Sequence, residues 1–375
     1  MKKYELFLTC PKGLESVCKI DLASMNIADA QIQDGGLSFR GTIKDIYIIN
    51  LCSRIGMNLL VKIIDFNFNS VDDFYNSIYK YHWNTFIDPK MTFSVDNIII
   101  KENSNFKNSQ FINLKAKDAI CDKIKKIRGI RPDIDKKAPH IGIKIVISDK
   151  NCIIYANSSG KSLYVRGYKD YHHEASINES LASGLIFLSS WNTKDPLLDP
   201  MCGSGTICLE AAMIKGNIPP GIIRTFSFQN WLNYDQDLFL SIVNRFTRNI
   251  DEEVRNTVFG SDINADFIQG AKETSQSFKF NLGVNFKIKN LTNLKSYENC
   301  HIVTNPPYQI RIGDENTEKT IHRGFKKILN NGNKIHLIYP YGSDFITQNY
   351  IFDEIAILYN GPIQCGFYRI NKCLK

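Results

Sequence analysis

The stretch that decides the fold of this chain is Asp199-Pro200-Met201-Cys202-Gly203-Ser204-Gly205-Thr206. An apolar run, 196–198, leads into the acid, and the residues after Thr206 have helical spacing. The pattern predicts a strand, a tight glycine turn and the start of a helix. Gly203 and Gly205 allow positive φ and a close approach to a ligand, and the first N–H groups of the helix can bind it. We therefore expect a small polar ligand at this turn.

The chemistry of that ligand follows from the acids around the turn. No Lys-Ser/Thr pair follows the glycines, and Cys208 stands where a dinucleotide fingerprint has its third glycine, so phosphate is a poor fit. Asp199 can instead accept from an ammonium group, while Asp262 ends a second strand-like run at the place where a ribose would lie. S-adenosylmethionine has both an amino acid end and a ribose. On these residues alone, an ordinary strand-to-helix turn remains the alternative.

A third motif, Asn305-Pro306-Pro307-Tyr308, follows the short apolar run 301–304. The prolines lack N–H donors, so the carbonyls of this turn face outward as acceptors. With the side-chain oxygen of Asn305 they would hold an amine while its nitrogen attacks a methyl group. Tyr308 offers a flat face on which a planar base can stack. A plain rigid turn is the alternative, but the position after a strand, downstream of the other two motifs, favours a substrate site.

The order of predicted elements indicates an α/β protein. The first 160 residues contain short strands and helices and end in a predicted hairpin, 141–147 with 152–156. From residue 197 strands and helices alternate, which predicts a parallel sheet with Asp199, Asp262 and Asn305 at strand carboxyl ends. The connection 216–256 is unusually long, and we expect it to shape a substrate groove near the ligand.

Composition limits the class of protein. The 375 residues are 43% hydrophobic and 22% charged, which indicates a folded chain with room for two or three domains. A net charge of +8 agrees with a polyanionic partner without requiring one. The ten Cys form no Cys-x-x-Cys pair and the seven His have no metal spacing, so no metal site is expected. No signal segment or membrane-spanning run is recognised, and we expect a cytoplasmic protein.

A basic segment near residues 115–137 is the candidate for RNA contact. Its first part predicts an amphipathic helix that ends at Gly129 and carries its charge on the solvent side. Ordinary solvation of a helix and contact with phosphates both explain that pattern. The candidate RNA-binding residues are Lys115, Lys117, Lys123, Lys125, Lys126, Arg128 and Arg131.

With these motifs the chain resembles the THUMP-domain guanine-N2 RNA methyltransferases, closest to the bacterial large-subunit (23S) ribosomal RNA group. The resemblance covers nearly the whole length. The motif from Asn305 to Tyr308 is shared with adenine and glutamine amide methyltransferases, so the N-terminal motifs carry most of the specificity. The resemblance rests on 13–15, 117–120, 129–132, 159–160, 163–164, 166–168, 199–206, 260–263 and 305–308 with Arg311.

The resemblance implies three domains: a ferredoxin-like segment at 1–56, a THUMP domain at 57–160 that grips RNA, and a class I, Rossmann-like methyltransferase domain at 161–375 that binds S-adenosylmethionine. The carried-over cofactor-binding residues are Asp199, Cys202, Gly203, Gly205, Thr206, Asp262, Ile263, Asn290 and Leu291. Of these, Asp199 and the two glycines would line the methionine end, and Asp262 would hold the ribose. The carried-over catalytic residues are Asn305, Pro306, Pro307 and Tyr308, which would grip the guanine amine and stack on the base.

Two positions depart from the family pattern. Asn290 stands where an acid near the adenine is usual, although its carbonyl oxygen can still accept from the adenine amine. Asn178 replaces a usual Lys before Glu179, which puts the role of that position in doubt.

The expected reaction is methylation of the N2 amine of a guanine in 23S rRNA by positioning and hydrogen bonding, with a paired target flipped out. No dedicated general base is nominated. The alternatives are a transfer RNA guanine-N2 methyltransferase, an RNA-binding assembly factor with an inert methyltransferase domain, and a protein or DNA methyltransferase.

Overall fold

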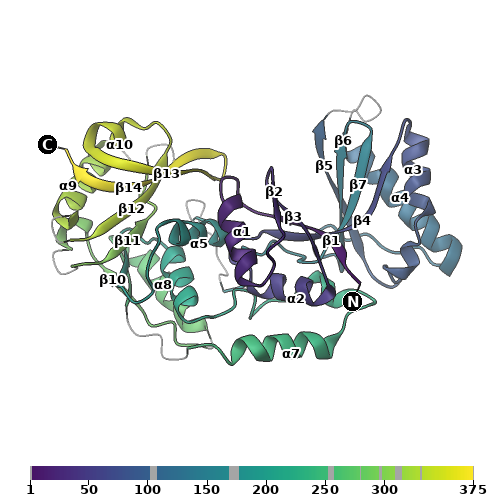
Figure 1. The fold of residues 1–375 in the computed structure, drawn as a ribbon, viewed down its shortest axis with the longest axis horizontal. Helices are drawn as coiled ribbons and strands as arrows, with labels where there is room; N and C mark the ends of the chain where they lie inside the picture. Colours follow the sequence, from purple (N-terminus) through teal and green to yellow (C-terminus); the bar gives the residue numbers. More distant parts are fainter. Residues whose placement is uncertain are drawn as a thin grey trace.

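The computed structural model describes residues 2–101, 108–168, 177–251, 257–278, 280–294, 298–308, 315–329 and 332–374. Two seven-stranded sheets lie at opposite parts of an elongated molecule (Figure 1). Helices pack on both sheets, so the chain is α/β as expected. Arg311 lies outside the described residues.

The first sheet has the strand order β2-β3-β1-β4-β7-β6-β5. Strand β4 pairs with β1 on one side and with β7 on the other, so the expected domains at 1–56 and 57–160 share one continuous sheet. Its elements are β1 (Tyr4–Thr9), α1 (Glu15–Ser24), β2 (Gln31–Gln33), β3 (Gly36–Gly41), α2 (Ile43–Cys52), β4 (Asn58–Asn67), α3 (Val71–Lys80), η1 (Trp83–Thr85), β5 (Phe93–Lys101), α4 (Ser109–Arg128), β6 (Ile141–Ser148) and β7 (Asn151–Asn157).

Local sequence explains several of these elements. Strand β6 alternates buried and half-buried residues, and it pairs antiparallel with β7 as the predicted hairpin. Asp149 makes the turn between them at φ +55. Helix α4 ends at Gly129, whose φ of +76 is a left-handed cap that favours glycine. Thr42 and Asp45 form a capping box at the start of α2.

The second sheet has the order β10-β9-β8-β11-β12-β14-β13. The strands from β10 to β12 are parallel, and the chain moves from β8 first to β9 and β10 and then back to β11, which places a topological switch between β8 and β11. Its elements are α5 (Glu179–Leu188), β8 (Leu197–Asp199), α6 (Thr206–Lys215), η2 (Ser227–Asn230), α7 (Gln236–Thr247), β9 (Val258–Asp262), α8 (Ala265–Ser277), β10 (Val284–Ile288), η3 (Leu291–Asn293), β11 (His301–Thr304), α9 (Glu315–Leu329), β12 (Lys334–Pro340), α10 (Asp344–Asn349), β13 (Tyr350–Asn360) and β14 (Ile363–Cys373).

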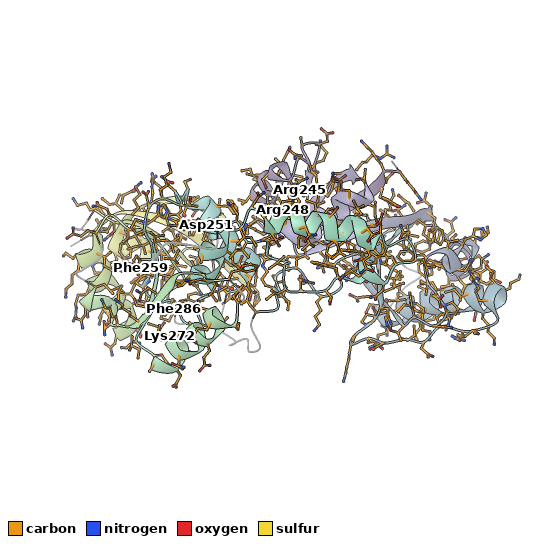
Figure 2. The ribbon with its side chains drawn as sticks, turned by 90° about the horizontal axis from the view of Figure 1, so that it is seen from below. Arg245, Arg248, Asp251, Phe259, Lys272 and Phe286 are labelled. Atoms are coloured by element: carbon orange, nitrogen blue, oxygen red, sulfur yellow. The ribbon has the colours of Figure 1, made fainter. Side chains whose placement is uncertain are left out.

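None of the described residues of the long connection, 216–251, lines the ligand cavity, where the sequence led us to expect a substrate groove. Its helix α7 packs against α2 of the first half, and the hydroxyl of Tyr47 accepts from the backbone N–H of Asp235 at 2.9 Å. Arg224 donates to the carbonyls of Ser162 at 2.7 Å and Val165 at 2.9 Å. Seen from below, α7 crosses the molecule toward its middle, with Arg245 near its end (Figure 2). The connection therefore braces the two halves.

A buried ion pair of the second half also contacts the first half through one of its members. Arg166 and Glu210 lie 3.2 Å apart with side chains 1% and 0% exposed. Arg166 Nη2 donates to the carbonyl of Arg54 at 2.6 Å, and Tyr168 donates to Glu210 Oε1 at 3.0 Å. Because both charged groups of the pair have further hydrogen-bond partners, their burial is tolerated.

The first turns of the chain fit closely against the second half. Leu14 is fully buried, and a Cβ added to Gly184 of α5 would lie 2.3 Å from it. Gly13, at φ +90, lies against the backbone of Ile357 in β13. The motif at 13–15 is thus a docking contact. Among the described residues, no helix combines the length and apolar character needed to cross a bilayer.

Candidate functional site

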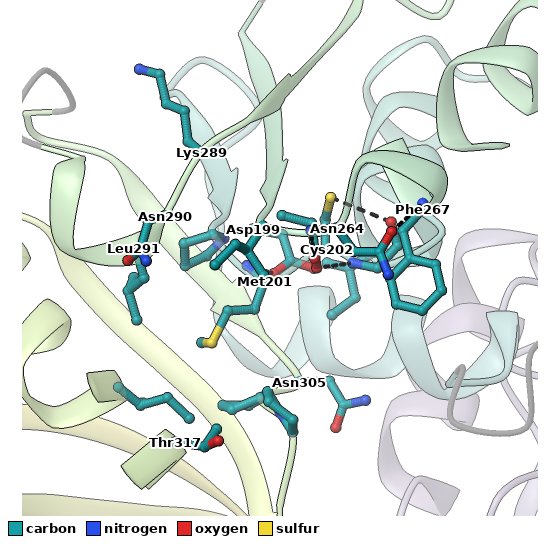
Figure 3. A pocket seen from close by; sticks show the side chains of 18 of the residues that line it. Asp199, Met201, Cys202, Asn264, Phe267, Lys289, Asn290, Leu291, Asn305 and Thr317 are labelled. Carbon is teal, nitrogen blue, oxygen red and sulfur yellow. Dashed lines mark hydrogen bonds between the residues drawn. The ribbon is translucent and has the colours of Figure 1, made fainter. Parts of the chain in front are cut away.

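A cavity of about 620 Å³ opens at the carboxyl ends of the parallel strands. Loops after β8, β9, β10 and β11 form most of its wall, and the first turns of α9 close another side. Figure 3 shows Asp199 and Cys202 at its centre, Asn290 and Leu291 on one side, and Phe267 on the other. The cavity therefore lies at the crevice that this topology offers to ligands.

The glycine turn is tied to the neighbouring strand. The N–H of Cys202 donates to the carbonyl of Ser261 at 2.9 Å, and the N–H of Gly203 donates to Asp262 Oδ2 at 2.9 Å. A Cβ added to Gly203, at φ +50, would meet no protein atom within 4 Å, because this backbone faces the cavity. Gly203 thus allows a ligand to approach the main chain.

Gly205 has a different role from the one expected. It does not line the cavity, and its φ of +82 caps the start of α6. A Cβ at this position would lie 2.7 Å from the ring of Phe286. The glycine is required for packing between the turn and β10, and it supports the ligand site indirectly.

Asp199 is held at the end of β8 and is only 2% exposed. Its Oδ1 accepts from the Thr304 hydroxyl at 2.7 Å and from the N–H of Met201 at 3.2 Å. Burial raises the pKa of this carboxyl to about 7, and the charge of Asp262 adds to the rise, although the two hydrogen bonds oppose it. A cation in the cavity would relieve this cost, which fits an ammonium ligand.

Asp262 is placed to accept hydroxyl groups. Its Oδ2 accepts from Gly203 N–H and its Oδ1 accepts from Asn264 N–H, each at 2.9 Å. Each carboxylate oxygen has a further lone pair, so the side chain can orient the turn and still bind a ribose.

Asn290 uses its carbonyl oxygen locally. Oδ1 accepts from the Thr292 N–H and from the Thr292 hydroxyl, both at 2.9 Å. Both lone pairs are engaged, so the oxygen is not available to an adenine amine as the sequence suggested. The amide NH₂ of Asn290 is the group that remains for a ring nitrogen acceptor.

The motif after β11 brings one orphaned acceptor to the cavity. Within the described residues, Asn305 Oδ1 is buried without a hydrogen-bond partner, while Asn305, Pro306 and Pro307 line the wall. An unpaired buried acceptor is costly unless a ligand satisfies it. A hydrogen-bond donor on a ligand in the cavity would satisfy this oxygen.

Tyr308 lies deeper than the stacking role predicts. It is 2% exposed, its hydroxyl accepts from Asn360 Nδ2 at 2.9 Å, and its ring meets Tyr339 edge-on at 5.6 Å. Its side chain still contributes to the cavity wall. In this conformation Tyr308 supports the turn, and only part of its surface is offered to a base.

Most of the residues that the sequence singled out lie together at this cavity. All predicted cofactor-binding and catalytic residues except Gly205 line the cavity. Sequence reasoning missed Asn264 and Phe267, although both follow the predicted ribose acid closely in the chain and could have been found from it. It also missed α9, because nothing local links that helix to the glycine turn. The further lining residues on α9 are Asn316, Thr317, Thr320 and Ile321.

The predicted RNA-binding residues lie on and just after α4, away from the cavity. Two of them share one ion-pair partner within the protein, since Lys117 and Arg131 each lie within 3.2 Å of Asp118. Lys123 and Lys126 lie over the ring of Tyr79 at 5.3 and 5.9 Å. Lys115 lies over the ring of Phe111, while Lys125 and Arg128 are exposed near the end of the helix. The helix is basic, but its charge is partly compensated.

Three family models match successive parts of the chain. The RlmL ferredoxin-like domain matches residues 5–57, the THUMP domain matches 68–157, and the RMKL-like methyltransferase domain matches 166–340. These matches agree with the domain order expected from sequence.

Individual relatives agree with the family models. The chain is 33% identical to the ribosomal RNA large subunit methyltransferase K/L of Psychromonas ingrahamii over 84% of its own length, and 32% identical to that of Buchnera aphidicola over 83%. It spans 43% and 46% of these two proteins, so it covers less than half of each. The structure of SMU.472 in complex with SAH superposes with a TM-score of 0.87 over 100% of both chains, at 25% identity. The chain belongs to the family of THUMP-domain methyltransferases that includes the ribosomal RNA large subunit methyltransferases K/L.

Proposed function

We propose that this chain is an S-adenosylmethionine-dependent methyltransferase that methylates the N2 amine of a guanine in 23S rRNA. The observation that carries the proposal is one cavity that holds a buried carboxyl, Asp199, a ribose-type acid, Asp262, and the unpaired acceptor of Asn305. The curated relatives are named as large-subunit rRNA methyltransferases, which supports rRNA as the substrate.

The cavity fits the cofactor at both ends. Asp199 would accept from the α-ammonium group, and the open space beside Gly203 would admit the amino acid chain. Asp262 would accept from the ribose hydroxyls, while the amide of Asn290 lies on the side expected for adenine. The SAH complex of SMU.472 supports this choice, because SAH is what S-adenosylmethionine becomes after methyl transfer. When bound, the cofactor supplies an electrophilic methyl group.

The protein's part in the reaction is to hold and orient the amine. The lone pair of a guanine amine is delocalised into the ring, so the amine is a weak nucleophile. Hydrogen bonds from its N–H groups to Asn305 Oδ1 and the Pro306 carbonyl would increase electron density on nitrogen and align it with the methyl group. After transfer, the extra proton leaves to solvent.

The first test separates substrate and chemistry. Labelled S-adenosylmethionine is incubated with the protein and with separated, unmodified 23S and transfer RNA, and the nucleosides are analysed. We expect N2-methylguanosine in 23S rRNA alone. The same nucleoside in transfer RNA would replace the proposed substrate, and binding of SAH without transfer to either RNA would contradict the proposed activity.

A point variant tests the assigned acceptor. Asn305→Ala should lower kcat by at least about 100-fold, since it removes an interaction with the reacting amine, while the dissociation constant of SAH stays within about twofold. Asn264→Ala is a contrasting variant, because Asn264 lies on the cofactor side of the same cavity and its Oδ1 caps α8. It should weaken SAH binding, whereas Asn305→Ala should lower kcat. Turnover by Asn305→Ala at the rate of the unmodified protein would refute the assignment.

A further inference from the structure

Helix α9 carries a charged surface that begins at the cavity. Its first turns line the cavity through Thr317, Thr320 and Ile321, and its apolar side is buried through Phe325 and Ile328. The opposite side is exposed and bears Lys319, Arg323, Lys326 and Lys327. We call these four residues the α9 basic stripe. At a rise of about 1.5 Å per residue the stripe runs about 12 Å away from the cavity wall.

Two of the four charges of this stripe have no ion-pair partner among the described residues. Among the described side chains of α9 the sole carboxylate is that of Glu318, and its Oε1 accepts from the Tyr339 hydroxyl at 2.7 Å. Within the described residues Arg323 and Lys326 form no ion pair, and Lys327 donates to the carbonyl of Thr292 at 3.1 Å. Several positive charges therefore face solvent together.

The helix is also held firmly. A Cβ added to Gly324 would lie 2.4 Å from Leu291, so α9 packs closely on η3, which itself contributes Leu291 to the cavity. A ligand bound along the stripe would thus have a fixed register relative to the cavity. Contacts on rigid elements beside a site can position a reacting group.

The stripe and the predicted RNA-binding helix lie at opposite ends of the molecule. In Figure 1, α9 is at the end of the second sheet, whereas α4 covers the far side of the first sheet. The cavity belongs to the second sheet and adjoins α9. If a polyanion contacts both surfaces, the part of it that passes the cavity is an internal segment and not one of its ends.

We propose that the α9 basic stripe binds the phosphates of the RNA strand on one side of the methylated nucleotide. This inference rests on the proposed function and extends it: the substrate is an internal nucleotide of a long RNA, gripped on both sides. The net charge of +8 does not by itself require such a surface, because an excess of this size is common on proteins that bind no polyanion.

The test compares two double variants with the same change in charge. Arg323→Gln with Lys326→Gln removes two charges from the stripe, whereas Lys194→Gln with Lys334→Gln removes two exposed charges at the amino ends of β8 and β12, the opposite edge of the sheet. Binding of unmodified 23S rRNA is measured by filter retention between about 50 and 300 mM salt, the range over which phosphate contacts change affinity strongly. Methyl transfer and SAH binding are measured in parallel.

The stripe variant should bind RNA about tenfold more weakly near 0.1 M salt. The slope of log K against log salt should become shallower by about 1.4, because each single-strand phosphate that is no longer neutralised reduces it by about 0.7. The SAH affinity of this variant should not change. Binding is also measured with RNA fragments that are trimmed close to the target nucleotide, either on its 5′ side or on its 3′ side. One of the two fragments should be bound equally well by the stripe variant and the unmodified protein, because it lacks the phosphates that the stripe contacts.

The inference would be overturned if the stripe variant bound RNA as tightly as the unmodified protein. It would also be overturned if the stripe and control variants lost the same affinity for RNA. Failure of the proposed function is a separate result. If the unmodified protein transfers no methyl group to rRNA, the filter assay still reports whether the stripe binds the RNA.

Discussion

The titration of Asp199 provides a sharp test of the cofactor site. Its carboxyl is buried and its pKa is raised to about 7, so an appreciable part is protonated near neutral pH in the free protein. If the ammonium group of the ligand binds the carboxylate form alone, the apparent dissociation constant equals the intrinsic one divided by the ionised fraction. Binding should therefore weaken as the pH falls through 7.

The magnitude follows from that pKa. Between pH 7.5 and pH 5.5 the ionised fraction of Asp199 falls from about 0.76 to about 0.03, so the dissociation constant of SAH should rise about 25-fold. The α-amino group of the ligand stays mostly protonated over this range, because such groups titrate near about 7.7–8.0 or above. Isothermal calorimetry across this pH range measures the profile, with circular dichroism to verify folding.

Two controls isolate the carboxyl. The compound 5′-methylthioadenosine keeps the adenine and ribose but lacks the amino acid, so its affinity should not change with pH. Asp199→Asn should weaken SAH binding about 10- to 150-fold at pH 7.5, because it removes a charged hydrogen bond worth about 1.5–3 kcal/mol, and it should give a flat profile. A flat SAH profile in the unmodified protein would refute the pairing of Asp199 with the ammonium group.

Three further outcomes are expected from packing and burial. Gly205→Ala should lower Tm and weaken SAH binding, because its Cβ would meet the ring of Phe286 at 2.7 Å and because a φ of +82 is strained for any residue with a Cβ. In the double variant that also carries Phe286→Leu, thermal melts should recover only in part, since the backbone strain and the contact with Ala271 at 3.1 Å remain. Glu210→Ala should reduce the free energy of unfolding by about 3–5 kcal/mol in urea titrations, since it leaves the buried charge of Arg166 unpaired. Burial lowers the pKa of His336 to about 3, so this residue is neutral in the folded protein, and its contribution to stability is lost as the pH falls below the unfolded value of about 6.5. Between pH 7 and pH 5 the loss that His336 contributes is about 2 kcal/mol. In urea titrations, His336→Phe should therefore lose about 2 kcal/mol less stability over this range than the unmodified protein, in which His301 also contributes.

The strands of the second half could be predicted because each is short, apolar and bounded by turn residues. The hairpin of β13 and β14 escaped prediction for a physical reason. Strand β13 has irregular register at Ile351/Phe352 and again at Glu354/Ala356, so its buried residues do not alternate. Strand β2 was also missed, because it has only three residues, of which Ile32 alone is apolar, and so gives too short a pattern.

The site could be predicted to the level of residues and not to the level of atoms. A motif identifies Asn290 as a wall residue, but the hydrogen bonds of its side chain to Thr292 decide which of its atoms faces a ligand. Likewise, the motif names Tyr308, while the packing of Tyr339 and Asn360 decides how much of the ring is exposed. The described part of the long connection, 216–251, does not line the cavity, and its helix α7 packs on α2 instead.

By itself, the sequence determined the glycine turn, the strand ends that carry Asp199, Asp262 and Asn305, and the left-handed cap at Gly129. These features depend on backbone conformations that neighbouring residues set through sterics and local hydrogen bonds. Only the tertiary structure decided that α9 closes one side of the cavity and that α7 packs against the first half. It also decided that Gly205 leaves room for the ring of Phe286. Those relations join segments far apart in the chain, and their partners are chosen by close packing, which no local pattern encodes.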